Sequence, residues 1–486
     1  MDERVLLIRP NHTQDKKDTY VTFPLGLAYI GAVLLKNGCK VQIIDLILED
    51  VNYDSLTDRI RKFNPTIIGI SALSYEYIQV KRLSAYLKTV VSCKIILGGH
   101  LANHSYDMIL KKTSVDVCIL GEGESTVVDV ISNLSALEKV KGIAYRDDGK
   151  VILNSPRELI NDLDTIPFPA YELFDIDKYS KFLMDDMYIS HKYLPKKKVH
   201  RQMTLEASRG CPFACNFCSK VYTRVRRRNL EKIVEEIKYL NETYDIDVFG
   251  FHDELVFSNK AFATEFCRAI KPLGVSWYGM LRVDIVNREI LKMFTESGCL
   301  TISFGVESGS ERILKNMNKK VTPAQIEKTL RDAFEVGLSV DMSLILGYPG
   351  EDEESVHDTI DLLKRVGYPG IKFRYVTPYP GSSLYNQCIE NGLIKDEEAY
   401  LESLGDGTGP YRFRINFTKF TDEELTALLP RTTKKILRNY LLYLLKHPGY
   451  LCRYLTHKDV MNPVYYYYNR WFRPTNYDKA AKRKAN

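Results

Sequence analysis

Short apolar runs rich in β-branched residues alternate with amphipathic stretches along most of this 486-residue chain. The alternation predicts parallel strands joined by helices, because a parallel connection needs a crossover long enough to hold a helix. The length exceeds one ordinary core, so we expect roughly two or three domains. We assign residues 1–150 to a first α/β domain, 151–200 to a linker, 201–395 to a second α/β domain and 396–486 to a helical, basic region.

The first α/β domain has five candidate strands, each followed by a candidate helix. The strands are Arg4 to Arg9, Lys40 to Leu46, Thr66 to Leu73, Lys94 to Leu97 and Val115 to Leu120. The helices are Leu25 to Asn37, Ser55 to Phe63, Tyr77 to Val91, Ser105 to Lys112 and Ser125 to Leu134. This order predicts a doubly wound, flavodoxin-like or Rossmann-like sheet, whose ligands lie beyond the carboxyl ends of its strands.

The loops at those carboxyl ends supply candidate ligand contacts, which are His12, Ser71, Gly98, Gly99 and Gly121. Small residues let a bulky ligand approach the backbone closely. No G-x-G-x-x-G sequence opens the first helix, which disfavours a dinucleotide. His12, like His100 after the fourth strand, is more typical of a loop histidine than of a metal ligand.

The second α/β domain repeats the alternation with six candidate strands. The strands are Met203 to Ala207, Val248 to Phe251, Trp277 to Leu281, Thr301 to Gly305, Val340 to Leu346 and Ile371 to Thr377. The helices are Asn229 to Glu242, Lys260 to Lys271, Arg288 to Ser297, Ser310 to Asn316, Pro323 to Glu335 and Glu354 to Val366. Six such units predict a partial (β/α)₆ barrel, in which catalytic groups gather at the carboxyl ends of the strands.

Three cysteines, Cys211, Cys215 and Cys218, lie in one short loop after the first of these strands. Their spacing lets all three thiolates converge on one metal centre. Iron–sulfur clusters normally take four cysteine thiolates, so a cluster held by three would keep one iron open to a substrate or cofactor. A structural zinc loop, the alternative, would require a fourth Cys or His nearby.

With the aromatic Phe217 just before its third cysteine, this loop resembles the signature of the radical S-adenosylmethionine (SAM) enzymes. In that family the open iron of a [4Fe–4S] cluster binds the amino and carboxylate groups of SAM, and an electron from the cluster breaks a C–S bond to give a 5′-deoxyadenosyl radical. The resemblance also implies roles for residues after the later strands. Asp253 or Glu254 would lie near the amino group of SAM, Arg282 near its carboxylate, Glu307 and Ser308 near ribose and methionine, and the backbone of Gly347 and Gly350 beside the adenine.

The first domain is similar to the cobalamin-binding domains that precede the barrel in one large subgroup of these enzymes, with Pro24 to Ala28 and Gly98-Gly99 in the expected places. The chain has no Asp-x-His-x-x-Gly motif, so the resemblance implies cobalamin without that lower histidine ligand. The implied function is methylation of an unactivated carbon in a small-molecule or lipid-like substrate. Methylcobalamin would supply the methyl group to a substrate radical, and a second SAM would remethylate the cobalt.

Three other functions stay open. The same cofactors serve ring closure or oxidation without methyl transfer in some relatives, and a non-enzymatic iron–sulfur adaptor would need no SAM chemistry. A tRNA methylthiotransferase-like enzyme would carry a second cluster, for which Cys39, Cys93 and Cys118 are the candidates. Because two of these lie at strand starts and one inside a strand, we interpret them as buried small apolar residues.

Charge is concentrated at the C-terminus: residues 431–486 hold 13 Lys or Arg and two Asp, whereas the whole chain has a net charge of +6. Basic residues there alternate with aromatic ones, which indicates either a helical cap or contact with a membrane surface, and we expect no nucleic-acid partner. The chain has neither an eighteen-residue apolar run nor a signal-peptide pattern, so we expect a cytoplasmic protein. The resemblance implies an electron donor such as flavodoxin or ferredoxin.

Overall fold

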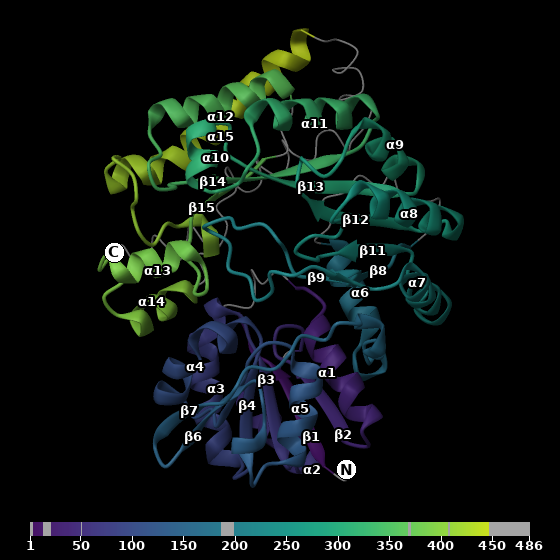
Figure 1. Cartoon of the computed structure of the whole chain (residues 1–486), viewed down its shortest axis with the longest axis vertical. Helices are drawn as coiled ribbons and strands as arrows, with labels where there is room; N and C mark the ends of the chain where they lie inside the picture. The colour runs from purple at the N-terminus through teal and green to yellow at the C-terminus, as the bar shows by residue number, and fades with distance from the viewer. Residues whose placement is uncertain are drawn as a thin grey trace.

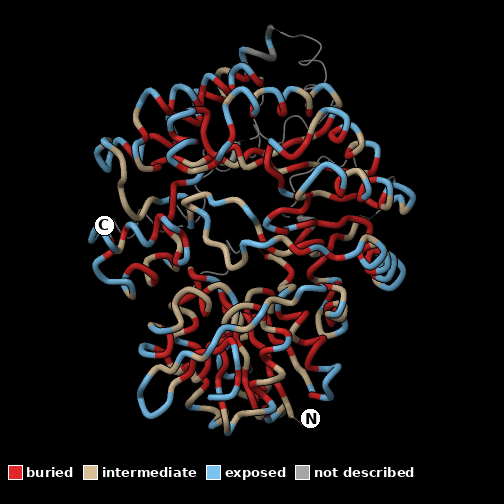
Figure 2. The backbone as a smooth tube through the Cα atoms, in the orientation of Figure 1, coloured by how far each residue is buried: buried red, intermediate tan, exposed pale blue. Residues whose placement is uncertain are grey.

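The computed structural model describes residues 3–12, 21–49, 51–185, 199–367, 371–406 and 409–446. Its two main sheets follow one another along the chain, and helices cover each of them (Figure 1). Buried backbone follows the strands and the helix faces turned toward them (Figure 2). The fold is the predicted one, a doubly wound sheet followed by a half-barrel.

The first sheet has the strand order β2-β1-β3-β4-β5-β6-β7 within the described residues. Its strands are β1 Arg4–Arg9, β2 Lys40–Asp45, β3 Ile67–Ser71, β4 Lys94–Gly98, β5 Val117–Ile119, β6 Ile143–Asp147 and β7 Lys150–Leu153. The first five are parallel and correspond to the predicted strands. The sequence does not predict the antiparallel β6–β7 hairpin, because both strands are short and β7 is at most half-buried. This hairpin crosses residue 150, so the proposed end of the first domain stays a prediction.

Helices cover both faces of this sheet: α1 Leu25–Lys36, α2 Tyr53–Phe63, α3 Tyr77–Val90, α4 His100–Lys112 and α5 Gly123–Ser132. A parallel sheet covered on both faces needs continuous apolar strands, and residues 5–8 of β1 are all buried. Cys39 lies in the core on one face of the sheet and Cys118 in the core on the other. The two thiols therefore cannot hold a shared second cluster, which disfavours the methylthiotransferase-like alternative.

The second sheet has the order β15-β14-β13-β12-β11-β8 within the described residues, and all its pairings are parallel. Its strands are β8 Gln202–Leu205, β11 Val248–Phe251, β12 Ser276–Leu281, β13 Cys299–Glu307, β14 Val340–Leu346 and β15 Ile371–Tyr375. The helices outside it are α7 Leu230–Tyr244, α8 Lys260–Ile270, α9 Arg288–Glu296, α10 Glu311–Asn316, α11 Pro323–Glu335 and α12 Glu353–Val366. All six predicted strand–helix units are present, and they form an open half-barrel.

Two segments outside these sheets join them. Helix α6 (Ile176–Asp185), which the sequence does not predict, lies in the expected linker and places Tyr179 against Asp45 of the first domain. Helices α13 (Ser383–Glu390) and α14 (Glu397–Leu404) follow the barrel in the chain but pack into the core of the first domain. There Lys81 of α3 forms ion pairs with Glu398 and Glu402.

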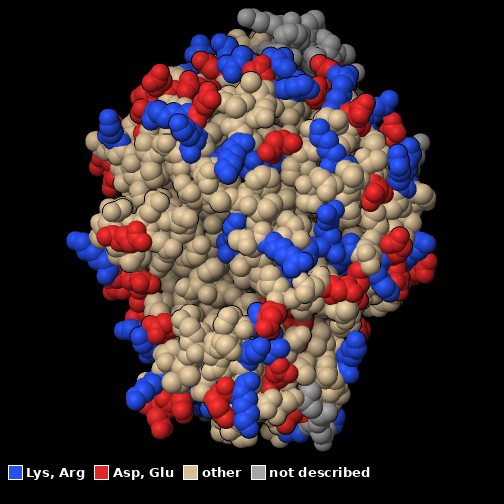
Figure 3. Space-filling model, in the orientation of Figure 1, with Lys and Arg blue, Asp and Glu red and all other residues tan. Residues whose placement is uncertain are grey.

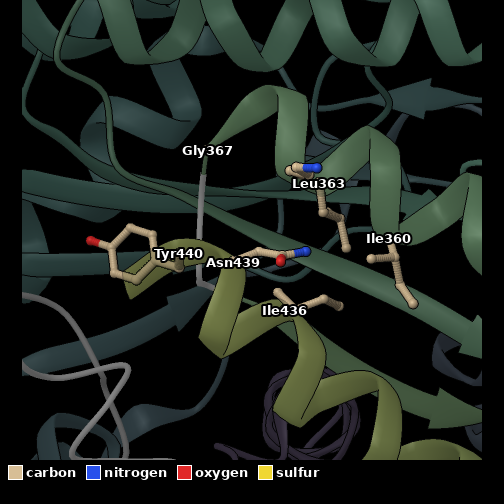
Figure 4. A pocket seen from close by; sticks show the side chains of 7 residues that line it. Ile360, Leu363, Gly367, Ile436, Asn439 and Tyr440 are labelled. Atoms are coloured by element: carbon tan, nitrogen blue, oxygen red, sulfur yellow. The ribbon is translucent and has the colours of Figure 1, made fainter. Parts of the chain in front are cut away.

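Helix α15 (Asp422–Lys446) lies in the region predicted to be helical and is continuous through Pro430. Leu425, Leu428 and Leu429 join the barrel core, so the helix packs on the protein rather than extending from it. A small pocket between α12 and α15 lies in this outer layer and away from the carboxyl ends of the strands (Figure 4). The aromatic and basic residues predicted for the tail beyond 446 lie outside the described residues. No described helix is both long and apolar enough to cross a bilayer.

Candidate active site

The cysteine loop grows from a short antiparallel hairpin at the carboxyl end of β8, made of β9 Ser208–Arg209 and β10 Arg226–Arg227. Gly210 follows β9 with a φ of +92°. A Cβ at this position would lie 2.3 Å from the carbonyl oxygen of Arg224. Only glycine tolerates both this conformation and this approach, so the hairpin can close the base of the loop.

Backbone hydrogen bonds hold the middle of the loop over the barrel. The amide of Asn216 donates to the carbonyl of Met317 at 3.0 Å, and the amide of Leu384 donates to the carbonyl of Asn216 at 2.9 Å. Lys220 Nζ donates to the carbonyl of Cys211 at 3.1 Å. The loop is therefore fixed through its backbone amides and carbonyls.

The three cysteines share the open side of this loop: Cys211 and Cys215 are half-buried and Cys218 is exposed. Among the described residues, no three His, Cys, Asp or Glu side chains lie close enough together to hold a single metal ion. Each thiolate of a four-iron cluster binds a different iron, so its ligands lie farther apart than those of one zinc ion. Three thiolates from one loop match the ligand number of a cluster that keeps one iron open.

Asp253 and Glu254, after β11, occupy different environments. Asp253 is buried under the cysteine loop, where it accepts hydrogen bonds from the amide of Ala207 at 2.9 Å and from Ser208 Oγ at 3.0 Å. Burial raises the pKa of Asp253 to about 8. Glu254 is exposed. Of the two candidates for the amino group of SAM, Asp253 supports the loop from below, and Glu254 is the one open to a ligand.

Arg282, after β12, lies against the cysteine loop but is already paired. Its guanidinium donates to Asp284 at 3.0 and 2.9 Å and to the carbonyl of Lys319 at 2.8 Å. It also stacks on the Phe213 ring, with its central carbon 3.6 Å from the ring centroid, and Nη1 lies 3.9 Å from Cys215 Sγ. The sequence does not indicate Asp284 or Phe213 as partners, because each contact depends on how the loops fold.

Glu307 and Ser308, at the end of β13, are both buried. Glu307 has a φ of +63° and pairs with Lys319 Nζ at 2.9 Å. Lys319 in turn lies over the Phe217 ring, 5.9 Å from its centroid. The structure therefore brings the residue before the third cysteine together with the end of β13.

The turn after β14 carries two glycines, of which Gly347 is buried and Gly350 is exposed. Gly347 and Gly350 have φ values of +76° and +86°, which glycine adopts without strain. The buried carboxyl group of Glu351 accepts a hydrogen bond from the Gly347 amide at 2.5 Å. Burial raises the pKa of Glu351 to about 8. Glu351 fixes this turn, and its predicted contact with adenine stays a prediction, because side chains of Leu425 and Asn316 already lie beside the two glycines.

The carboxyl edge of the first sheet faces the barrel and carries the glycines predicted to contact a bulky ligand. A Cβ on Gly98 or Gly121 would meet no described atom within 4 Å, so both glycines border open space. Gly99 differs, because a Cβ there would lie 2.7 Å from the carbonyl oxygen of Ala72 and 3.2 Å from Ser71 Oγ. Gly99 therefore shapes the turn, whereas Gly98 and Gly121 leave bare backbone for a corrin-sized group.

Two histidines lie at this edge, and only His12 has a hydrogen-bond partner on its ring among the described residues, because His104 Nε2 has none. His12 is buried, with Nδ1 2.5 Å from Glu76 Oε1, in keeping with a loop histidine. The sequence does not indicate His104, whose ring lies beside Gly381 in the loop after β15. A Cβ on Gly381 would lie 2.4 Å from that ring, so first domain and barrel loop touch here.

The inner face of the half-barrel is polar, which the motifs do not reveal. Along β8, Met203 and Leu205 join the outer apolar core. Gln202 and Thr204 alternate with them and face inward, as side chains on a strand do. Both are more than nine-tenths buried. Gln202 Oε1 and Thr204 Oγ1 have no hydrogen-bond partner among the described residues.

Tyr278 of β12 extends this polar wall across the neighbouring strand. Its hydroxyl contacts Gln202 Nε2 and lies 3.2 Å from His252 Nε2. A Cβ on Gly250 would lie 2.3 Å from that hydroxyl, so only glycine lets the ring cross β11. On the opposite strands Ser303 Oγ lies 3.5 Å from Asp341 Oδ2. The half-barrel thus presents hydrogen-bonding groups to whatever fills it.

A cysteine loop on a parallel half-barrel, set against the ligand edge of a doubly wound sheet, defines an iron–sulfur enzyme with a second cofactor domain. Residues 205–363 match the model of the radical SAM superfamily, and residues 16–131 match that of the B12 binding domain. The chain belongs to the radical SAM superfamily, among members that carry a B12-binding domain. Its cofactors are a [4Fe–4S] cluster, SAM and cobalamin.

Three of the relatives that this chain resembles are methyltransferases or a cyclase by name. An uncharacterized methyltransferase of Pyrococcus horikoshii is 32% identical over 80% of this chain and 84% of its own length. The cytidylyl-2-hydroxyethylphosphonate methyltransferase of Streptomyces wedmorensis is 29% identical over 82% of this chain and 84% of its own. The anaerobic magnesium-protoporphyrin IX monomethyl ester cyclase of Rubrivivax gelatinosus is 27% identical over 91% of this chain and 82% of its own. The chain is therefore similar to methyltransferases and to a cyclase.

A solved structure matches both halves. The radical SAM methyltransferase TsrM of Kitasatospora setae, with cobalamin and a [4Fe–4S] cluster bound, superposes with a TM-score of 0.65 over 80% of this chain and 75% of its own. The two chains share 15% sequence identity, so the match concerns the fold.

Proposed function

We propose that this enzyme transfers a methyl group to an unactivated carbon of a polar small molecule. The observation that carries the proposal is that the carboxyl edges of the two sheets meet. Glu124, after β5, binds Arg209 at 2.7 Å, two residues before the first cysteine, and His104 touches the loop after β15. A substrate between these edges would reach both cofactor sites, as methyl transfer to a substrate radical requires.

The cofactors supply the bond cleavage and the methyl group when bound, and the protein positions them. Cys211, Cys215 and Cys218 would hold the cluster, and Glu254 and the turn at Gly347 would contact SAM. The bare backbone at Gly98 and Gly121 would hold the corrin. Asp253 keeps the loop in place, because its carboxyl group accepts hydrogen bonds from the amide of Ala207 and the hydroxyl of Ser208, between β8 and β9.

The polar inner wall supports a substrate with hydroxyl or amino groups rather than a plain hydrocarbon. Gln202 Oε1 and Thr204 Oγ1 are already buried without a hydrogen-bond partner among the described residues, which costs about 1–3 kcal/mol each. A hydrogen-bond donor of the substrate removes this cost. A lipid-like substrate fits only if its polar head occupies the wall.

Ring closure or oxidation with the same cofactors is the second candidate, and the similarity to the cyclase of Rubrivivax gelatinosus favours it. Product mass separates the two functions. Methyl transfer adds one CH₂ to the substrate, whereas ring closure removes two hydrogens.

The test compares aqueous and chloroform extracts of a strain lacking this gene, each incubated anaerobically with reconstituted enzyme, SAM, hydroxocobalamin and titanium citrate. We expect a product heavier by CH₂ from the aqueous extract, and about tenfold less of it with Thr204→Val or Tyr278→Phe, since one hydrogen bond is worth about 1 kcal/mol or more. Thr264→Val on the exposed side of α8 is the control. A product lighter by two hydrogens would replace methylation with ring closure, and a product only from chloroform would contradict the polar substrate.

We further propose that a flavodoxin or ferredoxin reduces the cluster and that the enzyme works in the cytoplasm, where thiols stay reduced. Membrane contact through the basic tail is a separate proposal. Lys and Arg side chains gather near the middle of the face shown in Figure 3, beside a hollow with few charged groups. An acidic donor would be attracted to such a face.

A further inference from the structure

A buried ion cluster joins the loop after β5 to the base of the cysteine loop. Glu122 accepts from Arg226 Nη1 at 2.7 Å with both carboxylate oxygens and from Arg209 Nη1 at 3.0 Å. Glu124 accepts from Arg209 Nη2 at 2.7 Å. The two arginines face each other across the β9–β10 hairpin. Both loops are therefore held by the same charges.

The cluster is buried, unlike the other ion pairs that join the two domains. The side chains of Glu122 and Arg226 are each 2% exposed, whereas Lys81 and Glu402, at the α3–α14 contact, are 37% and 39% exposed. Removing one member of a buried pair leaves an uncompensated charge, which exposed pairs avoid through water. The two loops consequently cannot separate without a large loss of interaction.

Glu122 also fixes the segment that leads out of the first domain. Its Oε2 accepts from the amide of Ile160 at 2.6 Å, and Arg226 Nη1 donates to the carbonyl of Ile160 at 2.7 Å. One carboxylate thus touches three segments: the bare loop at Gly121, the hairpin under the cysteines and the linker. A purely local role would not require all three.

We propose that Glu122 is a positioning residue that sets the spacing between the corrinoid and the cluster. The inference rests on the proposed function, since it takes Gly121 as part of the corrinoid edge. Glu122 touches neither cofactor in this scheme. It acts by holding the loop after β5 at one distance from the cysteine hairpin.

The test uses Glu122→Gln in full-length protein, with Glu158→Gln as the matched control. Glu158 lies in the linker, two residues before Ile160, and pairs with Lys141, but its side chain is 78% exposed. Hydrogen–deuterium exchange without corrinoid is the first readout. We expect exchange about tenfold faster in peptides covering 117–124 and 205–228 for Glu122→Gln only, because a lost buried contact of this kind exceeds 1.4 kcal/mol.

The second readout separates positioning from folding. With SAM, titanium citrate and hydroxocobalamin, S-adenosylhomocysteine forms when the S–CH₃ bond breaks and the methyl group joins two-electron-reduced cobalt. The reductive cleavage consumes one electron and gives methionine and the 5′-deoxyadenosyl radical, which becomes 5′-deoxyadenosine by taking a hydrogen atom from a substrate or a C–H or S–H donor in the buffer, and this reaction needs only the barrel. A misplacement of about 1 Å can cost a hundredfold in rate. We therefore expect Glu122→Gln to lose S-adenosylhomocysteine formation by about tenfold to a hundredfold while 5′-deoxyadenosine stays within about twofold.

Equal loss of both products, or unchanged exchange in Glu122→Gln, would overturn the proposal. If Glu122→Gln does not fold, Glu124→Gln, which removes a single contact of Arg209, should show the same split to a smaller degree, and its absence there would refute the idea. Wild-type protein that forms 5′-deoxyadenosine but no S-adenosylhomocysteine would instead count against methyl transfer, while the exchange result would still decide the role of Glu122.

Discussion

Replacing Gly210 with alanine should damage the cysteine loop more than a conformational cost alone predicts. An alanine at φ +92° costs about 1–2 kcal/mol. Its Cβ would lie 2.3 Å from the carbonyl oxygen of Arg224, which is backbone and cannot rotate away. Moving the hairpin by about 1 Å to relieve that overlap costs a further 1–3 kcal/mol or so. The total, roughly 2–5 kcal/mol, falls on the segment that carries all three cysteines.

Gly274→Ala is the control, because Gly274 has a φ of +65° but no described atom within 4 Å of its Cβ position. It carries the conformational cost without the overlap. Both variants are reconstituted anaerobically, and iron per chain and the urea midpoint are measured. We expect about four irons per chain for wild type and Gly274→Ala and a clear deficit for Gly210→Ala. Full iron content and an unfolding midpoint equal to that of Gly274→Ala would refute the packing described for Gly210.

Three further predictions concern the cluster, a buried acid and the tail. Replacing Cys211, Cys215 and Cys218 together with alanine should abolish 5′-deoxyadenosine formation while hydroxocobalamin still binds, as measured by its absorption spectrum. Loss of both would contradict a role of these cysteines in the cluster alone. Burial raises the pKa of Glu351 to about 8, so the unfolded chain loses this proton at a lower pH than the folded protein does. The stability that the protonated Glu351 contributes is therefore full below about pH 4 and is lost as the pH rises through about 8. Glu351→Gln should therefore show a smaller fall in urea midpoint than wild type between about pH 6 and pH 8.5, and an equal fall would contradict the burial of this carboxyl group. A chain ending at Lys446 keeps α15 on the barrel core. If the tail contacts membranes, this shortened chain should float with anionic liposomes less than the full chain does, and equal flotation of the two would exclude that contact.

Local patterns in the sequence suffice for the parallel strands of both sheets, because strands buried on both faces are continuous apolar runs such as residues 5–8. They do not suffice for the short antiparallel β6–β7 hairpin. The cysteine spacing likewise indicates the cluster without any tertiary information. Contacts between distant segments are a different matter. The contacts of Asp253 under the loop and of Arg282 on Phe213 depend on how neighbouring loops fold. The sequence therefore cannot tell whether these residues bind SAM or support the cysteine loop. Tyr278 joins the polar wall only because Gly250, its partner on the neighbouring strand β11, lets the ring pass.

The packing of α13 and α14 on the first domain bears on how the chain matures. Leu401 and Leu404 complete a core whose other members come mostly from residues 6–144. The ribosome adds these leucines only after the entire barrel has been synthesised. Until then the nascent first domain leaves an apolar side uncovered, which is where chaperones bind and where aggregation starts. A fragment that ends just after β7 (Lys150–Leu153) should accordingly aggregate, and adding residues 383–404 as a separate peptide should reduce that aggregation.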